Sequence, residues 1–316
     1  MRKLANFSVI SMKPVICIAG PTASGKSAYA IEIARVLDGE IINADALQVY
    51  SDLQVLSARP TKDEMEDVPH HLFGHVSGEV RYSTGEWLRE VDPLIIEILS
   101  RGKTPVLVGG TGLYFRALLQ GMADIPAVPK DIFDDTQALY DERGIVHLRD
   151  LAEAYDPISA AKIQGDDPQR LMRIICVSRA TGKPLSEWQA ETHPVIPSRF
   201  ARFCVLIPPR ENLYERINLR YDEMLRGGGL AEAKAVFKKG YDSGLPVMKA
   251  IGLRQLGSYF KGLDTLNEAI EVAKRDSRRF AKRQMTWFRN QPPKGRLLET
   301  VSEREAYLQE LAEVQF

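Results

Sequence analysis

The chain has 316 residues, of which 44% are hydrophobic and 27% are charged, as is usual for a soluble globular protein. Lysine plus arginine and aspartate plus glutamate balance at 42 each, so the net charge does not by itself indicate a polyanionic partner. The three cysteines, Cys17, Cys176 and Cys204, lie far apart, which argues against a disulfide framework or a zinc finger. No apolar run reaches the length of a membrane span, and we expect a cytoplasmic protein without a membrane partner.

The first predicted elements are a strand, a phosphate-binding loop and a helix. An apolar run over residues 15–20 predicts the strand, and apolar residues at helical spacing over 28–37 predict the helix. The loop between them matches the P-loop pattern G-x-x-x-x-G-K-[ST], which binds ATP in many proteins, and consists of Gly20, Pro21, Thr22, Ala23, Ser24, Gly25, Lys26 and Ser27. Its backbone N–H groups and lysine would hold phosphate, and the Ser27 hydroxyl would ligate Mg²⁺. A chance glycine-rich turn is the alternative.

The second predicted strand covers residues 40–45 and ends in Asp45. In a parallel sheet this carboxylate would emerge at the same edge as the P-loop. It could then hold Mg²⁺ through water or accept a proton from a nucleophile. Alternatively, Asp45 only caps a following helix, because aspartate is favoured at that position.

The third predicted strand covers residues 104–110 and is followed by Thr111 within the sequence GGTG. Phosphoryl-transferring P-loop enzymes usually place an acidic Mg²⁺ ligand after such a strand. Here the place is taken by glycines and a hydroxyl that could donate to a phosphate oxygen. A tight strand-to-helix turn without any ligand would also explain the sequence.

A fourth strand is predicted over residues 202–209, and the chain after Arg210 reads as helical to its end. Apolar strands alternating with helices predict an α/β fold of the P-loop NTPase type, with a parallel sheet flanked by helices. Residues 122–199 contain only short helical segments closed by glycine or proline. We therefore expect an inserted all-helical subdomain at 122–199, within a core formed by residues 1–121 and 200–316.

Arginines recur at helical spacing in two further segments. Arg216 and Arg220 are four residues apart, so that either could reach a phosphate from one helix face. Arg170 and Arg173 are three apart, with Gln169 beside them, which suits contact with nucleic acid. Solvated arginines paired with nearby acids are the more common arrangement.

Residues 274–296 are strongly basic. They contain nine lysines and arginines and one acid, Asp276, a local balance of +8. On a helix, Arg275, Arg279 and Arg283 form one stripe, and aromatic residues are interleaved with it. Such a stripe gives salt-dependent affinity for RNA or DNA, and exposed aromatic rings stack on unpaired bases. A charge run is often only a solvated face, but the density here favours nucleic acid.

Seven segments in order resemble the tRNA dimethylallyltransferases: GPTASGKS, INADALQVY, PHHL, LVGGTGLYFRALL, DDPQRLMR, AIGLRQL and AKRQMTWFR. The resemblance covers nearly the whole chain. It implies transfer of a dimethylallyl group from dimethylallyl diphosphate to N6 of adenosine 37 in the tRNA anticodon stem-loop, with Mg²⁺ and without ATP. The P-loop would then hold the leaving diphosphate, so no acid is needed after the third strand. It also implies a bacterial-type enzyme, because the zinc finger of eukaryotic members is missing, and we expect a monomer.

The resemblance also implies roles for single residues. Asp45 would accept the proton, Thr111 and Arg220 would stabilise the diphosphate, and Ser27 would hold Mg²⁺. The residues in contact with tRNA would be Asp45, Ala46, Leu47, Gln48, Thr111, Gln169, Arg170, Leu171, Met172, Arg173, Arg279 and Arg283. Ala46 replaces the serine that is usual in the family, so one hydrogen bond near the adenosine or the metal must be absent or made by water. Cys176 replaces an acid.

Three other functions fit parts of the sequence. A P-loop kinase for a small metabolite would share the loop and the fold, but it would consume ATP and would not need the basic segment. A non-catalytic RNA-binding switch would bind ATP or GTP tightly. Prenyl transfer to free adenine nucleotides would leave the inserted subdomain without a basic surface for RNA.

Overall fold

The structure is a computed structural model that describes residues 13–291 and 293–313. The chain forms two compact units, one over Gln120–Pro194 and the other made of the described residues on either side of it. We expected the helical subdomain at 122–199, but the compact helical unit ends earlier, at Pro194. The backbone N–H groups of Val195 and Ile196 both donate to the Leu118 carbonyl, which attaches this stretch to the other unit.

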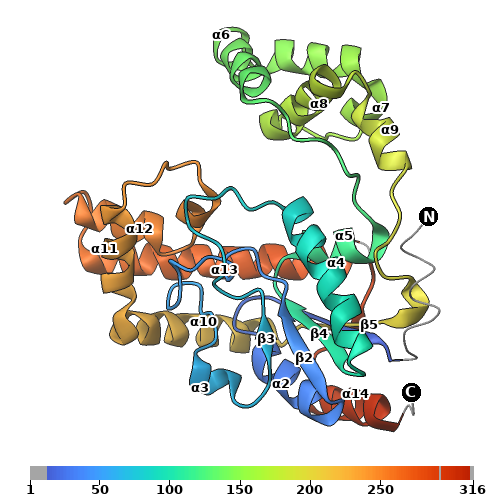
Figure 1. Cartoon of the computed structure of the whole chain (residues 1–316). Helices are drawn as coiled ribbons and strands as arrows, with labels where there is room; N and C mark the ends of the chain where they lie inside the picture. The colour runs from blue at the N-terminus through green and yellow to red at the C-terminus, as the bar shows by residue number, and fades with distance from the viewer. Residues whose placement is uncertain (1–12, 292, 314–316) are drawn as a thin grey trace. The chain divides into compact units, whose positions relative to one another are not determined.

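A six-stranded parallel sheet forms the centre of the larger unit, with strand order β3-β2-β4-β1-β5-β6 (Figure 1). The strands are β1 (Val15–Ala19), β2 (Gly39–Asn43), β3 (His70–His71), β4 (Thr104–Gly109), β5 (Ala201–Leu206) and β6 (Arg296–Leu298). The predicted α/β fold is confirmed, and the four predicted strands are present. The expectation that the chain is helical from Arg210 to its end is wrong at β6. This strand and β3 lie at the sheet edges and are too short to give an apolar pattern.

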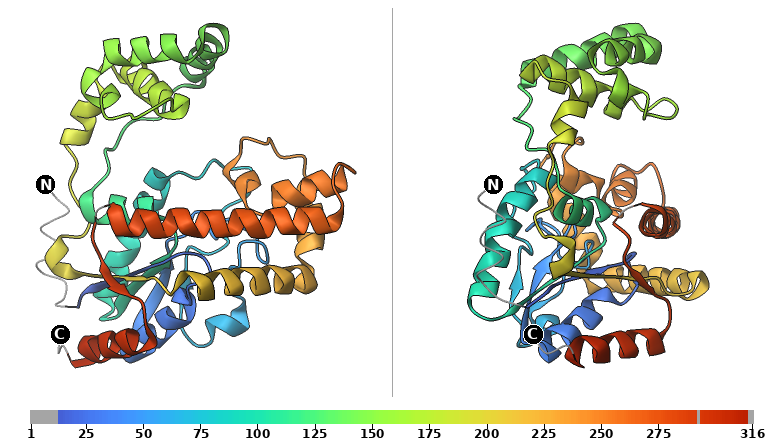
Figure 2. Two further views of the ribbon diagram at one scale, coloured as in Figure 1. Left: turned by 180° about the vertical axis from the view of Figure 1, so that it is seen from behind. Right: turned by 90° about the vertical axis from the view of Figure 1, so that its right-hand side faces the viewer.

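Helices cover both faces of the sheet. The helices of this unit are α2 (Lys26–Val36), α3 (Lys62–Met65), α4 (Thr84–Ser100), α5 (Gly112–Gln120), α10 (Arg210–Met224), α11 (Leu230–Lys238), α12 (Leu253–Phe260), α13 (Leu266–Asn290) and α14 (Val301–Glu313). One face buries side chains of α4, α5, α10 and α13, such as Trp87 and Phe288, and the other buries side chains of α2 and α14. Figure 2 shows α13 and α14 on opposite sides of the sheet.

The long helix α13 is fixed at its start and along one side. The Thr265 hydroxyl accepts a hydrogen bond from the Glu268 N–H, and the Glu268 carboxylate accepts one from the Thr265 N–H, which forms a capping box. Ala281, Met285 and Phe288 are buried in the core beside the sheet. Exposed positions of the helix carry basic side chains such as Arg279, Lys282 and Arg283.

The smaller unit contains α6 (Lys130–Tyr155), α7 (Pro157–Ala160), α8 (Pro168–Thr181) and α9 (Leu185–Ala190). Gly144 interrupts α6 with φ of 74°, at the glycine where the sequence predicts a helix end. The Asp167 carboxylate accepts from the Arg170 N–H and caps α8, and Gly182 ends it in the left-handed region. Across both units, none of the described helices is long and apolar enough to cross a membrane.

Candidate active site

The predicted P-loop connects β1 to α2. Gly25 has φ of 87°, a conformation that glycine adopts without strain. At Gly20 there is no room for a side chain, because a Cβ atom would lie 2.8 Å from the Leu206 carbonyl oxygen. No described side chain caps α2, and its first turn contains no acid. The N–H groups at this helix end therefore favour an anion.

A cavity of about 420 Å³ opens at this loop. Besides Thr22, Ala23, Ser24, Gly25, Lys26, Ser27 and Ala28, it is lined by Asp45, Gln48, Ser57, Glu64, Arg216, Leu219, Arg220 and Glu223. The fold thus brings the P-loop, the end of β2 and the α10 arginines together at one edge of the sheet. Thr111 is not among the residues that line it.

The basic residues that line this cavity are Lys26, Arg216 and Arg220, and two of them donate to backbone carbonyls. The Lys26 ammonium donates to the Pro21 carbonyl at 3.2 Å, and Arg220 Nη2 donates to the Ala58 carbonyl at 3.5 Å. Burial lowers the pKa of Lys26 to about 8, while the Asp45 carboxylate acts in the opposite direction. Burial also lowers the pKa of Arg220. Neither cation forms a close ion pair with a carboxylate in the described part of the chain, so their charge is available to a bound anion.

Asp45 follows β2 in a turn. Its Oδ1 atom accepts from the Leu47 N–H at 3.0 Å, and its own N–H donates to Asn43 Oδ1 at 2.9 Å. The alternative that Asp45 caps a helix is wrong, because residues 46–49 form turns. A Cβ atom on Gly110 would lie 3.3 Å from Asp45 Oδ2, so the carboxylate lies against the turn after β4.

Thr111 lies in that turn and contacts the Asp45 segment through the backbone. Its Oγ1 atom accepts from the Ala46 N–H at 2.9 Å, and its N–H donates to the Ala44 carbonyl at 3.3 Å. A hydroxyl that accepts one hydrogen bond still has its own proton to donate. Thr111 thus keeps a donor beside Asp45, and the Ala46 contact needs no side chain.

Gln48 is largely occupied by the protein itself. Its Nε2 atom donates to the carbonyls of Ser57 and Ala58, at 3.1 and 2.9 Å. The loop before them is held by Glu232 of α11, whose carboxylate accepts from the N–H groups of Gln54, Val55 and Leu56, each at 2.8 Å. This wall of the cavity is therefore fixed from two sides. The neighbouring Leu47 packs against the apolar cluster of α11 and α12.

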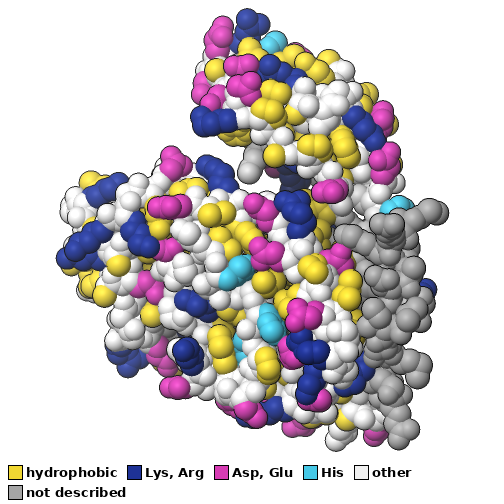
Figure 3. All heavy atoms as spheres, viewed as in Figure 1, with side chains coloured by type: hydrophobic (Ala, Val, Ile, Leu, Met, Phe, Trp, Pro, Cys, Tyr) yellow, Lys and Arg dark blue, Asp and Glu magenta, His cyan; other side chains and the backbone are white. Residues whose placement is uncertain are grey.

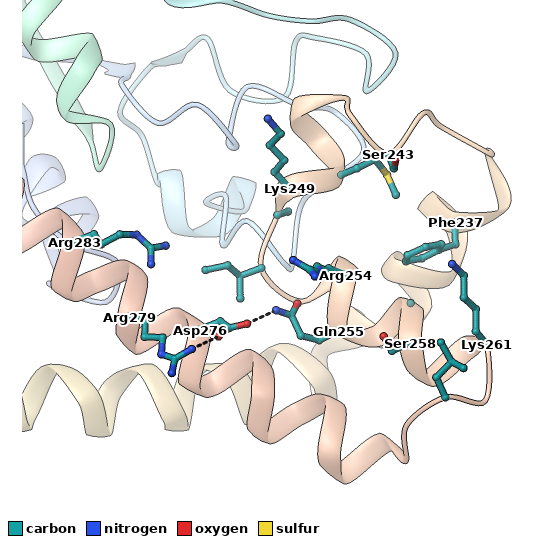
Figure 4. A pocket seen from close by; sticks show the side chains of 15 residues that line it. Phe237, Ser243, Lys249, Arg254, Gln255, Ser258, Lys261, Asp276, Arg279 and Arg283 are labelled. Atoms are coloured by element: carbon teal, nitrogen blue, oxygen red, sulfur yellow. Dashed lines mark hydrogen bonds and ion pairs between the residues drawn. The ribbon is translucent and has the colours of Figure 1, made fainter. Parts of the chain in front are cut away.

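Two basic residues of α13, Arg279 and Arg283, line a separate cavity of about 710 Å³ between α12 and α13 (Figure 4). Arg279, Arg283, Arg254 and Lys249 lie around it, with Lys261 farther out. The space-filling view shows lysine and arginine side chains gathered over α11 and α12 (Figure 3).

The predicted three-residue stripe is only partly present there. Arg275 does not line the cavity, and its Nε atom lies 3.6 Å from Asp276. Arg279 and Arg283 also border a neighbouring hollow with Trp287. Two arginines and one partly buried aromatic residue, Trp287, thus remain as candidates for contact with nucleic acid.

In the smaller unit, the predicted tRNA-contacting segment forms the first turns of α8. Gln169, Arg170 and Arg173 are exposed, and Arg170 Nε lies 3.1 Å from Asp167. Leu171 and Met172 are instead buried in the core of this unit. Their side chains pack beneath the turn and are not available to RNA.

The sequence did not single out Gln284 of α13, which reaches the P-loop. Its Oε1 atom accepts from the Thr22 N–H at 3.0 Å, and its Nε2 atom donates to the Gly110 carbonyl at 2.9 Å. Three residues on, Trp287 lies against Gly112, where an added Cβ would be 2.0 Å from the indole nitrogen. The available signal was a glutamine on the apolar face of a helix that is otherwise basic.

Comparison with known proteins assigns the chain to a family. Residues 48–291 match the family model "IPP transferase", and residues 13–72 match "Isopentenyl transferase". The tRNA dimethylallyltransferase of Hyphomonas neptunium is 49% identical over 89% of this chain and 90% of its own length. That of Maricaulis maris is 43% identical over 96% of this chain and 98% of its own length.

Solved structures agree. The tRNA isopentenylpyrophosphate transferase of Bacillus halodurans has a TM-score of 0.66 and 33% identity, over 95% of this chain and 94% of that one. A eukaryotic dimethylallyltransferase described as acting on tRNA has a TM-score of 0.77 and 29% identity, over 87% of this chain and 70% of that one. The family models, the curated relatives and the solved structures agree that this chain belongs to the tRNA dimethylallyltransferase family of transferases.

Proposed function

We propose that this enzyme transfers a dimethylallyl group from dimethylallyl diphosphate to N6 of adenosine 37, beside the anticodon of tRNA, and releases diphosphate. The observation that carries the proposal is the cavity at the P-loop, where Lys26 and Arg220 form no close ion pair with a carboxylate among the described residues and Asp45 lines the same space. The basic residues and the helix N-terminus suit a diphosphate, and the Asp45 carboxylate suits a proton acceptor.

At the donor, the bond between C1 and the diphosphate oxygen breaks, and its electron pair stays on that oxygen. Positive charge spreads over the allyl unit, while negative charge grows on the diphosphate. Lys26, Arg220 and the loop N–H groups stabilise this growing charge without needing to rearrange. No phosphorus atom is attacked, so no acidic group is required after β4.

Mg²⁺ fits this site as a partner of the diphosphate. The described residues contain no cluster of three or more histidine, cysteine or acidic side chains that could hold a metal. Mg²⁺ characteristically keeps several waters and binds through one or two protein groups and substrate phosphates. The exposed Ser27 hydroxyl would supply one protein group. When bound, Mg²⁺ would neutralise part of the charge on the leaving diphosphate.

At the acceptor, the exocyclic amine forms a new C–N bond to C1 and loses a proton. This amine is a weak nucleophile because its lone pair is conjugated with the ring. Asp45 takes the proton, and Thr111 can donate its hydroxyl hydrogen beside it. The base must leave its stack to reach a recessed carbon, as in other enzymes that act on a nucleobase.

We propose that tRNA is held by two sets of residues, one on each unit. On the larger unit, Arg279 and Arg283 with the other basic residues of their cavity contact phosphates. On the helical unit, Gln169, Arg170 and Arg173 form an exposed basic turn. The protein would work as a monomer in the cytoplasm, where its tRNA substrate is found.

The test mixes purified protein, Mg²⁺ and unmodified tRNA with either dimethylallyl diphosphate or ATP. Diphosphate release and a heavier adenosine are measured by mass spectrometry of digested tRNA. The allylic donor alone should give both products. Phosphate transfer from ATP would identify a kinase, and prenylation of free AMP in place of tRNA would identify a nucleotide prenyltransferase.

A further inference from the structure

We infer that Gln284 is a positioning residue that joins the diphosphate loop to the turn beside Asp45. The inference rests on the proposed function, because it deepens the account of the same site. Gln284 contributes one carboxamide to two backbone groups: it accepts from the Thr22 N–H and donates to the Gly110 carbonyl. Thr22 belongs to the P-loop, and Gly110 precedes Thr111.

These two hydrogen bonds are difficult to replace because the Gln284 side chain is buried. Gln284 is only 6% exposed, so water does not replace its amide when the amide is removed. Loss of the carboxamide would leave the buried Gly110 carbonyl and the partly buried Thr22 N–H without this partner, and an unpaired buried polar group is costly. The two bonds also specify the orientation of the carboxamide, because oxygen must face Thr22 and nitrogen must face Gly110.

The turn that Gln284 contacts also lies against Asp45, the proposed proton acceptor. A Cβ atom on Gly110 would meet Gln284 Nε2 at 2.4 Å, Asp45 Oδ2 at 3.3 Å and the Gly20 carbonyl oxygen at 3.4 Å. Gly110 is therefore packed between α13, the end of β2 and the start of the P-loop. Movement of this glycine would displace Thr111 and the carboxylate of Asp45 together.

Helix α13 also borders the basic cavity between α12 and α13, which we propose contacts tRNA. Arg283, next to Gln284 in sequence, lines the basic cavity, and Trp287, one turn on, covers the backbone of Gly112. Helix α13 thus borders the basic cavity and also contacts the turn after β4 that contains Gly110 and Thr111. Gln284 is the residue on it that hydrogen-bonds to the P-loop.

The first test compares Gln284→Met with Met285→Leu. Methionine keeps the length of the side chain but removes both hydrogen bonds. Met285→Leu disturbs the packing of the adjacent buried residue and leaves the carboxamide in place. Gln284→Met should lower kcat about 10- to 100-fold, because the Gly110 carbonyl and the Thr22 N–H both lose this partner, with KM for tRNA within about twofold of wild type. Met285→Leu should change both values by less than about threefold.

The second variant, Gln284→Glu, distinguishes hydrogen bonding from packing through its pH profile. Ionised glutamate still accepts from the Thr22 N–H, but its other oxygen faces the Gly110 carbonyl and repels it. Protonation restores a donor toward Gly110. The ratio of Gln284→Glu to wild-type kcat should therefore rise as the pH is lowered from 8 to 5.5. This variant also decides the case if Gln284→Met fails to fold.

Binding of inorganic diphosphate with Mg²⁺, measured by calorimetry, tests the inference independently of transfer. Gln284→Met should weaken this binding about 5- to 10-fold, and Met285→Leu should not. If wild type transfers no dimethylallyl group, the proposed function fails while this measurement still judges Gln284. The inference is overturned if Gln284→Met keeps both kcat and diphosphate affinity within twofold of wild type, or if the Gln284→Glu ratio does not change with pH.

Discussion

Asp45 is the residue on which the proposed chemistry depends most directly. Its position near the P-loop follows from the topology, because both come after the carboxyl ends of strands of one parallel sheet, β1 and β2, which are separated by β4. The choice between a base and a helix cap could not be made from the sequence. The structure decides against the cap, since a turn follows and Oδ1 accepts from the Leu47 N–H.

We predict that Asp45→Asn lowers kcat about 10²- to 10⁴-fold, the usual contribution of a positioned general base. Asparagine keeps an oxygen for the Leu47 N–H, so the turn should persist. Affinity for tRNA, measured by filter binding, should stay within about threefold. Steady-state turnover close to that of wild type would exclude Asp45 as the proton acceptor.

The pKa of Lys26 gives a prediction about pH. Burial lowers it to about 8 from the usual value near 10.5, so the ammonium of the free enzyme is charged below pH 8 and loses its proton above it. kcat/KM for the donor should fall as the pH rises through about 8, because this ratio reports ionisation in the free enzyme. Lys26→Arg should be less active but should lack this basic limb. A wild-type profile that stays level to pH 9.5 would contradict the assignment.

The contact between Gln284 and the P-loop could not be predicted from the sequence. Its partner Thr22 is 262 residues away in the chain, and only the tertiary fold brings them together. The P-loop, in contrast, is a local motif whose spacing fixes its geometry, and it was predictable residue by residue. Leu171 and Met172 show a second limit of the sequence. The family resemblance predicted that they contact tRNA, but α8 directs both side chains into the core of the helical unit.

At the scale of elements, the strands with a continuous apolar run were predicted, including β5, which is only partly buried in its first half. β1, β2 and β4 are buried along their whole length and give continuous apolar runs. β3 has two residues and β6 has two exposed residues of three, so neither carries such a signal. The kink at Gly144 was predictable because glycine marks it in the sequence.

We predict that Glu232 of α11 holds the wall of the donor cavity. Glu232→Ala would leave the N–H groups of Gln54, Val55 and Leu56 without their carboxylate, and hydrogen bonds to a charged group are worth roughly 1.5–3 kcal/mol each. The free energy of unfolding should fall by about 2–4 kcal/mol in urea titrations. Lys234→Ala, an exposed change on the same helix, should have almost no effect. A loss below 1 kcal/mol for Glu232→Ala would show that the loop is held by other contacts.

Helix α13 should contribute charge to RNA binding. Replacing Arg279 and Arg283 together by glutamate should weaken tRNA binding and flatten its dependence on salt, because fewer phosphate counterions are released. Arg275→Glu is the matched control, since this residue lies on the same helix but outside the basic cavity. Affinities at 50, 100 and 200 mM salt would be compared. A double variant with the wild-type salt slope would remove these arginines from the interface.

At the scale of the whole molecule, the chain forms an α/β unit and a helical unit. The sequence predicted this division from the absence of strands after Gly121. The sequence placed the second boundary of the helical unit near residue 199, whereas the compact unit ends at Pro194. Composition changes gradually there, whereas the hydrogen bonds of Val195 and Ile196 to Leu118 mark the return to the larger unit.

The central claim is that the P-loop holds the leaving diphosphate of an allylic donor while a carbon group is transferred. The most direct measurement is a crystal structure with a non-reactive thio analogue of dimethylallyl diphosphate and Mg²⁺. The account predicts that the diphosphate contacts the loop N–H groups, Lys26 and Arg220, with C1 directed toward Asp45. A loop that leaves the analogue unbound and accepts only a purine triphosphate would contradict it.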